Sequence, residues 1–179
     1  MKQRIGVIGS GDVGQTLASG FLKYGYEVMI GTRKPESLAN WQKDSANRGQ
    51  VGNITETAKF GDIVVLAVKG IAAMDVVKQA GINNLKGKTV IDVTNPIAQK
   101  PPVNGVISFF TSLDESLIEQ MQRLAPEANF VKAFNSVGYV DFVNPKYAAG
   151  KPSMFLSQKH PRPLRPPSLP SRRRKDPSH

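Results

Sequence analysis

The feature that most constrains this chain is the glycine loop in "RIGVIGSGDVGQTLASGF", where Gly9, Gly11 and Gly14 lie between an apolar run and an amphipathic helical pattern. This G-x-G-x-x-G spacing at a strand-to-helix turn is typical of a unit that binds a dinucleotide. The first glycine permits a tight turn, the second lets a pyrophosphate approach the backbone, and the third lets the helix pack close to the strand. The alternative is a glycine-rich turn that binds nothing, which the surrounding pattern disfavours.

Apolar runs of strand length alternate with helical periods along most of the chain. We expect strands at residues 4–9, 27–30, 63–68, 89–93, 129–134 and 153–156, and a weaker one at 51–54. Several runs are continuously apolar, as in strands that are covered on both faces. Helical spacing connects three sets of residues: Val13, Leu17, Phe21 and Tyr24; Ile71, Met74 and Val77; Leu117, Ile118, Met121 and Leu124. This alternation predicts an α/β fold with a doubly wound parallel sheet.

The last of these helices has start and stop signals of its own. Ser112 and Glu115 have capping-box spacing, and Pro126 follows the last apolar position. A Ser with a Glu three residues later favours a helix start, and a Pro marks the region just past a helix end. We therefore predict that Ser112 caps this helix.

The end of the second predicted strand indicates which dinucleotide is bound. Units that bind NAD carry an acidic residue about 20 residues after the loop, whereas NADP needs cations for its 2′-phosphate. Here the place is taken by Gly31, Thr32, Arg33 and Lys34. A charge-assisted Arg–phosphate bond contributes about 1.5–3 kcal/mol, which favours NADP roughly 10- to 150-fold. A solvated basic turn is the alternative, and it is disfavoured because helix starts prefer acidic residues.

Composition divides the chain into a body and a tail. Residues 158–179 hold seven of the 24 Lys and Arg residues but one of the 14 acidic residues, and six of the 13 prolines. We expect a dinucleotide-binding domain at 1–157 and a disordered Pro/Arg-rich tail at 158–179. The body is only mildly basic, so we expect no nucleic-acid partner. No apolar run could span a membrane and no cysteine is present, which favours a cytoplasmic protein.

Acid–base groups are scarce in the body. The two histidines, His160 and His179, lie in the tail, so neither a His general base nor a Ser-His-Asp arrangement is expected in the domain. Lys69 and Tyr139 are the nearest candidates for a proton donor. Three carboxylates, Asp62, Asp92 and Asp141, have no metal-ligand spacing and are expected to be solvated or to cap turns. Trp41, Phe109 and Phe110 could line a cleft, although packing is the commoner role of single aromatic residues.

Further segments carry a family resemblance. With the glycine loop and the Thr-Arg turn, "DIVVLAVK", "VIDVTNP" and "VKAFNSVG" resemble the coenzyme F420-dependent NADP oxidoreductases. This family includes the F420:NADP reductases and, more distantly, the reductase domains of six-transmembrane metalloreductases. The resemblance covers residues 3–157. Past Ser157 the sequence departs from the family pattern, and we expect that the tail is not family sequence.

The resemblance implies a set of residues that bind the cofactor. The pyrophosphate turn corresponds to Ser10, Gly11, Asp12 and Val13, and the 2′-phosphate pair to Thr32 and Arg33, with Lys34 as a third contact. Segments near the rest of the cofactor correspond to Ala67, Val68 and Lys69, to Asn95 and Pro96, and to Ala133, Phe134 and Asn135. Many relatives have Pro where Lys69 stands, so the loop shape here is expected to differ.

The resemblance also implies an activity, which is hydride transfer between NADP(H) and a flavin or deazaflavin acceptor. Such a transfer needs mainly two rings held in contact, with the cofactors supplying the chemistry, and this suits a body without histidine. Two alternatives remain open: an NADPH-dependent flavin or ferric reductase, and an NADP(H)-binding module without turnover. A homodimer is compatible with the resemblance.

Overall fold

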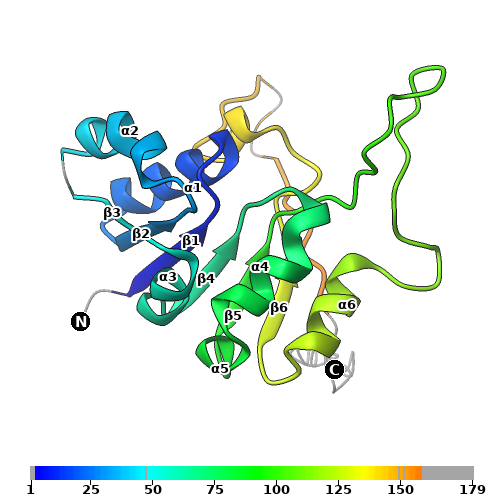
Figure 1. The fold of residues 1–179 in the computed structure, drawn as a ribbon. Coiled ribbons are helices and arrows are strands. Elements are labelled where there is room, and N and C mark those ends of the chain that lie inside the picture. Colours follow the sequence, from blue (N-terminus) through cyan, green and yellow to red (C-terminus); the bar gives the residue numbers. More distant parts are fainter. Residues whose placement is uncertain (1–2, 47, 149, 151, 159–179) are drawn as a thin grey trace, which may run out of the picture.

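The computed structural model describes residues 3–46, 48–148, 150 and 152–158 of the 179-residue chain. Strands and helices alternate in the order that the sequence predicts (Figure 1). The strands are β1 Arg4–Ile8, β2 Glu27–Gly31, β3 Gln50–Gly52, β4 Ile63–Leu66, β5 Thr89–Asp92 and β6 Asn129–Lys132. The α-helices are α1 Asp12–Lys23, α2 Ala39–Asp44, α3 Ile54–Phe60, α4 Ala73–Ala80, α5 Ile82–Leu85 and α6 Leu117–Leu124. Short 3-10 helices are η1 Pro35–Leu38, η2 Gly70–Ala72 and η3 Tyr139–Asp141.

The six strands form one sheet in the order β3-β2-β1-β4-β5-β6, and every pair of neighbours is parallel. The order reverses between β1 and β4, so the connections run outward in both directions from β1. This is the doubly wound arrangement with a switch point at the carboxyl end of β1, where α/β proteins bind their ligands. The predicted fold class is confirmed.

Both faces of the sheet are covered, which explains the continuously apolar strands. In β4, Val64 and Leu66 face one hydrophobic cluster and Val65 faces the other. The first cluster packs under α3, α4, α5 and α6, and its largest buried side chain is Phe130. The second packs under α1, η1 and α2 and includes Trp41. Figure 1 shows these helices as two layers on either side of the sheet.

The predicted cap of the last helix is wrong by four residues. Helix α6 starts at Leu117, and Ser116 and Glu119 form the reciprocal capping box. The spacing of Ser and Glu occurs twice in a row, and Glu115 instead forms an ion pair with Arg123. Because the apolar positions that face the core begin at Leu117, burial selects the second of the two possible starts. The helix ends at Leu124, before Pro126, as predicted.

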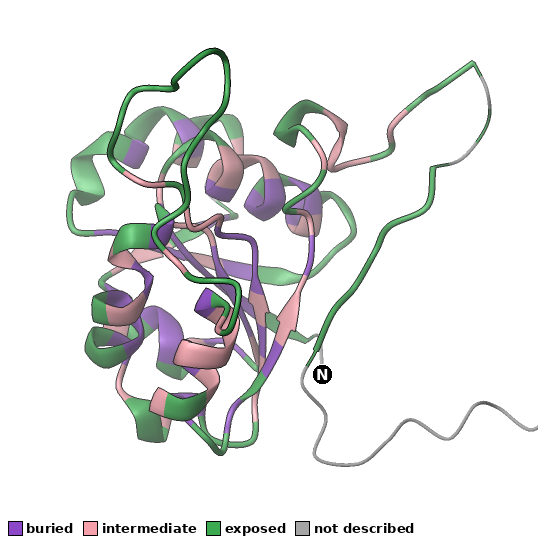
Figure 2. Ribbon diagram, turned by 90° about the vertical axis from the view of Figure 1, so that its right-hand side faces the viewer, coloured by how far each residue is buried: buried purple, intermediate pink, exposed green. Residues whose placement is uncertain are grey.

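A long apolar arm, residues 97–110, lies between β5 and α6. Backbone hydrogen bonds join Ala98 to Ser108 and Val103 to Val106, and a tight turn with positive φ at Asn104 and Gly105 closes the tip. Asn-Gly suits such a turn because both central residues must adopt positive φ. Figures 1 and 2 show the arm projecting from the body as an exposed segment. This arm was not predicted from the sequence.

The predicted strand at 153–156 is wrong. Residues 152–156 have no strand assignment, and a single antiparallel bridge joins Ser157 to Lys132 on the outer edge of β6. Met154, Phe155 and Leu156 are exposed, because this segment meets the sheet only at its last residue. Residues 159–179 of the predicted tail lie outside the described residues.

Candidate functional site

The predicted site residues gather at the carboxyl edge of the sheet. They lie in the turns that follow five parallel strands and in the first turn of α1, and parallel strands end at one edge. After β1 come Gly9, Ser10, Gly11, Asp12, Val13 and Gly14; after β2, Thr32, Arg33 and Lys34; after β4, Ala67, Val68 and Lys69; after β5, Asn95 and Pro96; and after β6, Ala133 and Asn135. Backbone bonds extend the sheet into these turns, for example from Gly9 N to Gly31 O at 3.0 Å.

The glycine loop has the geometry that its spacing predicts. Gly9 adopts φ +128°, and a Cβ added there would lie 2.1 Å from the carbonyl oxygen of Ala67. A Cβ at Gly14 would lie 2.0 Å from the carbonyl oxygen of Gly9. The loop therefore closes tightly onto β4 and onto the first turn of α1, and neither position has room for a side chain.

Gly11 differs from its two neighbours because its open side faces empty space. No heavy atom lies within 4 Å of a Cβ added there. Gly11 is also the N-cap of α1, and no side chain among the described residues caps this helix start. Free backbone N–H groups and the positive end of the helix dipole favour an anion at such a place. The loop thus fits a dinucleotide whose pyrophosphate approaches the backbone at Gly11.

Thr32 links the glycine loop to the cationic turn. Its side chain is buried, its hydroxyl is hydrogen bonded to the hydroxyl of Ser10 at 2.9 Å, and it accepts a bond from the backbone N–H of Lys34 at 3.1 Å. The backbone N–H of Thr32 donates to Gly52 O. Thr32 therefore fixes the turn that presents the two exposed cations, Arg33 and Lys34. Among the described residues neither cation forms an ion pair.

The turns after β4 and β5 pack directly against each other. A Cβ added to Gly70 would lie 2.1 Å from the carbonyl oxygen of Asn95 and 3.1 Å from the Cα of Pro96. Lys69 precedes Gly70 and is exposed, with extended backbone. Gly70 was not among the predicted site residues, because a lone glycine at the start of a short helix can have many roles.

A buried ion pair joins the ends of β5 and β6, and it decides between the two roles expected for Asp92. Asp92 is 0% exposed, so it is not solvated, and it caps the turn that follows it. Its Oδ2 lies 2.8 Å from Lys132 Nζ, and its Oδ1 accepts a bond from Thr94 N at 2.9 Å. The ammonium of Lys132 also donates to the carbonyl oxygen of Thr94. The sequence signal was weak: each of the two predicted strands contains one charged residue within an apolar run, but their pairing depends on the strand register.

Backbone strain marks the turn after β6. Phe134 adopts φ +63°, which is uncommon for a bulky residue, and its ring lies 4.9 Å from that of Phe142. The next residue, Asn135, accepts a hydrogen bond through its carbonyl oxygen from Asn95 Nδ2 at 3.3 Å. Strained backbone of this kind costs about 1–3 kcal/mol and concentrates at functional sites.

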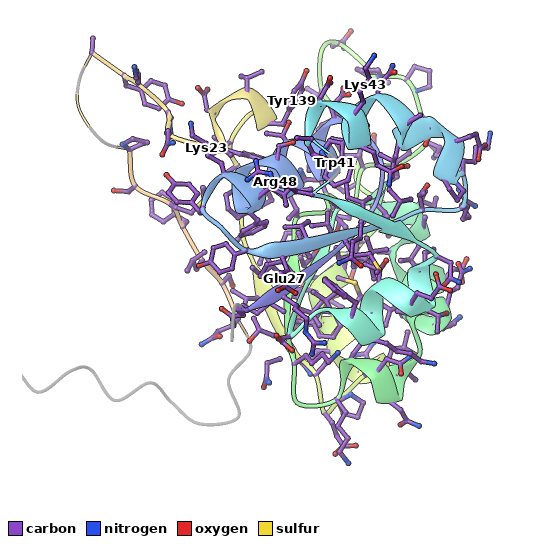
Figure 3. All side chains as sticks on the ribbon, turned by 90° about the vertical axis from the view of Figure 1, so that its left-hand side faces the viewer. Lys23, Glu27, Trp41, Lys43, Arg48 and Tyr139 are labelled. Carbon is purple, nitrogen blue, oxygen red and sulfur yellow. The ribbon has the colours of Figure 1, made fainter. Side chains whose placement is uncertain are left out.

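The aromatic residues that were candidates for a cleft or a proton donor differ in their surroundings. Trp41 is buried and donates from Nε1 to Ser19 on α1 at 3.0 Å, so it packs instead of lining a cleft (Figure 3). Phe109 and Phe110 are exposed on the arm, and Phe110 N bonds to Pro96 O. Tyr139 lies on η3 and is 42% exposed.

Two classes of site find no support in the described part of the chain. No group of three His, Cys, Asp or Glu side chains could hold a metal ion there. No described helix has both the length and the apolar character needed to cross a membrane.

Comparison with known proteins identifies the family. The family model "NADP oxidoreductase coenzyme F420-dependent" matches residues 4–96, which is more than half of the chain. The chain belongs to this family. The predicted family and the predicted cofactor, NADP, are therefore confirmed, and the chain is assigned to the NADP-dependent oxidoreductases.

Solved structures agree with this family. A putative F420-dependent NADP reductase from Arthrobacter sp. FB24 superposes with a TM-score of 0.80 at 30% identity, over 90% of this chain and 75% of that one. A hypothetical protein from Sinorhizobium meliloti gives 0.70 at 26% identity with the same coverage. The metalloreductase STEAP3 of Rattus norvegicus is 27% identical over 134 residues. That match covers 75% of this chain but only 25% of the rat protein.

Proposed function

We propose that this F420-type oxidoreductase transfers hydride between NADP(H) and a flavin-like or deazaflavin acceptor at the carboxyl edge of its sheet. The observation that carries the proposal is the division of this edge into two parts. One part presents open backbone at Gly11 and two exposed cations, Arg33 and Lys34. The other presents the strained turn at Phe134 and the apolar arm.

The anion-binding part is proposed to hold the phosphates. The backbone of Ser10, Gly11, Asp12 and Val13 would bind the pyrophosphate, with Gly9 and Gly14 closing the loop behind it. Arg33 and Lys34 would pair with the 2′-phosphate, because guanidinium and ammonium groups form charge-assisted bonds with phosphate oxygens. The buried hydroxyl of Thr32 holds the turn and lies beside Ser10, so it couples the two phosphate sites.

The second part is proposed to hold the nicotinamide half and the acceptor. The turns at Ala67, Val68 and Lys69, at Asn95 and Pro96, and at Ala133 and Asn135 lie across the sheet from the cations. The arm begins directly after Pro96, and its base exposes Ile97, Phe109 and Phe110. Two aromatic rings and an aliphatic side chain at this point suit a flat ring system, which gains most from stacking and exclusion of water.

Hydride transfer between two ring systems needs few reactive side chains. When bound, NADPH supplies the hydride. The protein has to hold the two rings in contact and exclude water, which is a matter of position. A body without histidine is suited to this task and less suited to ketone reduction, which needs a proton donor beside the oxygen.

Absorbance at 340 nm tests the proposal. The protein is mixed with NADPH and, in separate reactions, with oxidised F420, FMN or no acceptor, and loss of absorbance is followed without oxygen. We expect oxidation that depends on an acceptor and on the protein. Tight binding of NADPH without oxidation by any acceptor would support the non-catalytic module instead. Oxidation with FMN but not with F420, together with reduction of a ferric chelate added in a further reaction, would support the flavin or ferric reductase.

A further inference from the structure

The ends of β5 and β6 are joined by more polar bonds than two strand ends need. Asp92 and Lys132 are partners in register, and each is the last residue of its strand. The carboxylate of Asp92 accepts from Lys132 through Oδ2 and from Thr94 N through Oδ1, and Lys132 also reaches Thr94 O. The result is a closed network in which one ammonium and one carboxylate bind both polar backbone groups of Thr94.

Burial makes this network costly to build. Asp92 is 0% exposed and the side chain of Lys132 is 16% exposed. Taking two charges out of water loses more than their attraction regains unless further hydrogen bonds complete the arrangement, and a well-packed apolar pair is often at least as stable. An apolar pair could not bind the N–H and the carbonyl of Thr94. What the ion pair adds is therefore the direction of the chain beyond β5.

The same network lies at the base of the strained turn. Phe134, at φ +63°, is two residues after Lys132, and strained backbone persists only where the surroundings over-determine it. Lys132 fixes the strand end before it, the ring of Phe142 holds its side chain, and the bond from Asn95 Nδ2 to Asn135 O holds the residue after it. The ion pair of Asp92 and Lys132 therefore lies at the start of both turns that would face the nicotinamide, and it holds both of them.

We propose that Asp92 and Lys132 are positioning residues, which act through the turns after β5 and β6 to set where the nicotinamide end of the cofactor lies. This inference rests on the proposed function, and it adds that different residues order the two ends of the cofactor. The cations at Arg33 and Lys34 bind the adenosine end, whereas the buried clamp of Asp92, Lys132 and Thr94 orders the other end. Neither charge of the pair has to touch the cofactor.

Two ligands distinguish binding at the adenosine end of the site from binding at the nicotinamide end. NADPH spans the whole site, whereas 2′,5′-ADP carries the adenosine and its 2′-phosphate but lacks the nicotinamide. The test variant is the double substitution Asp92→Asn with Lys132→Met, which removes both charges together and leaves no buried charge unpaired. The matched control is Arg4→Met with Asp62→Asn, which removes a cross-strand ion pair at the opposite edge. Dissociation constants are measured by calorimetry, and folding is monitored by circular dichroism.

We expect the clamp variant to bind 2′,5′-ADP within about threefold of wild type and NADPH about tenfold more weakly, while the control binds both as wild type does. Hydride transfer at saturating NADPH should fall by about one to two orders of magnitude in the clamp variant. Equal weakening of both ligands, or no weakening of either, would overturn the clamp. If the wild-type protein binds neither ligand, the proposed function is wrong, and the positioning role of Asp92 and Lys132 is wrong as well.

A second variant covers the case in which the double substitution does not fold. Phe134→Gly accepts a positive φ without strain and removes the ring that packs on Phe142, so it loosens the turn without burying or removing a charge. It should show the same selective loss of NADPH affinity with 2′,5′-ADP binding retained. If Phe134→Gly binds NADPH and transfers hydride as wild type does, the turn needs no positioning and the proposal fails.

Discussion

The two edges of the sheet carry the same kind of interaction in opposite surroundings. At the amino edge, Arg4 at the start of β1 pairs with Asp62 just before β4 at 2.9 Å, with side chains 47% and 43% exposed. At the carboxyl edge, Lys132 and Asp92 pair at 2.8 Å with 16% and 0% exposed. The first pair is screened by water and neutralises charge locally. The second is shielded, so its geometry is enforced.

The difference extends to the charges around each pair. At the amino edge, Arg4 pairs with Asp62 and Lys86 pairs with Glu127. The Arg4 guanidinium also lies over the ring of Phe60. The carboxyl edge compensates its buried charge fully yet leaves Arg33 and Lys34 exposed beside a helix start. Uncompensated cations next to free N–H groups favour an anionic ligand, so the asymmetry between the edges supports the proposed phosphate site at the carboxyl edge.

The largest expected effects come from adding a methyl group at a tight glycine of either edge. A Cβ at Gly14 meets a backbone oxygen at 2.0 Å, and a Cβ at Gly61 on the amino edge meets Ile63 O at 2.5 Å and Gly6 N at 2.6 Å. Backbone cannot yield as a side-chain tip can, so Gly14→Ala and Gly61→Ala should each lower the free energy of unfolding by about 3 kcal/mol. Urea titration measures this loss.

Binding then distinguishes the edges. At temperatures where both variants remain folded, Gly61→Ala should bind NADPH as wild type does, and Gly14→Ala should bind it far more weakly. Gly11→Ala is the matched control, because it has open space around its Cβ and an extended backbone. It should keep its stability within about 0.5 kcal/mol and still lose NADPH affinity. Equal binding by all three variants would remove the functional contrast between the edges.

A smaller effect is expected when a cation is removed from the carboxyl edge. Arg33→Ala should shift the ratio of NADP to NAD affinity by roughly 10- to 150-fold toward NAD, because NAD has no 2′-phosphate to lose a partner. Stability should change little, since Arg33 is exposed. Parallel titrations with both dinucleotides measure the ratio.

Lys23→Ala is the control for charge alone. Lys23 is an exposed cation in the last turn of α1 (Figure 3). Because α1 spans Asp12–Lys23, Lys23 lies about 17 Å along the helix axis from the glycine loop. The substitution Lys23→Ala removes the same net charge as Arg33→Ala without changing the turn after β2. If Lys23→Ala shifts the ratio as much as Arg33→Ala does, the preference reflects the overall charge of the protein and not a 2′-phosphate site.

Most of the fold and the geometry of the glycine loop were predictable, because local patterns encode them. The spacing of Gly9, Gly11 and Gly14 predicts a tight strand-to-helix turn, and the structure has one. The role of Thr32, Arg33 and Lys34 at a 2′-phosphate stays a prediction from the chemistry of those side chains. The buried clamp was missed because Asp92 and Lys132 are 40 residues apart in the chain and meet only through the strand register. A charged side chain at a strand end is usually solvated, and the pairing across strands is what reverses that expectation.

Two other misses have the same origin. The strand expected at 153–156 has suitable residues, but strand formation needs a partner edge in register, and only Ser157 meets one. The cap of α6 was predicted at Ser112 but lies at Ser116, because the buried face of the helix begins at Leu117. In each case the local sequence allowed the element, and tertiary contacts determined whether or where it formed.

The smallest expected effect concerns the exposed pair of the amino edge. Hydrogen bonds from Arg4 hold the pKa of Asp62 below its ordinary value, so the folded protein favours the ionised carboxylate. The resulting stabilisation is fully present above the unfolded-state pKa of about 3.9 and is lost as pH falls through the lower folded-state value. Asp62→Asn should therefore lower the melting temperature slightly at neutral pH and match wild type in strong acid. Melting curves between pH 2 and 7 measure the difference, and a gap that stays constant down to the lowest pH would show that the pair contributes through packing instead of charge.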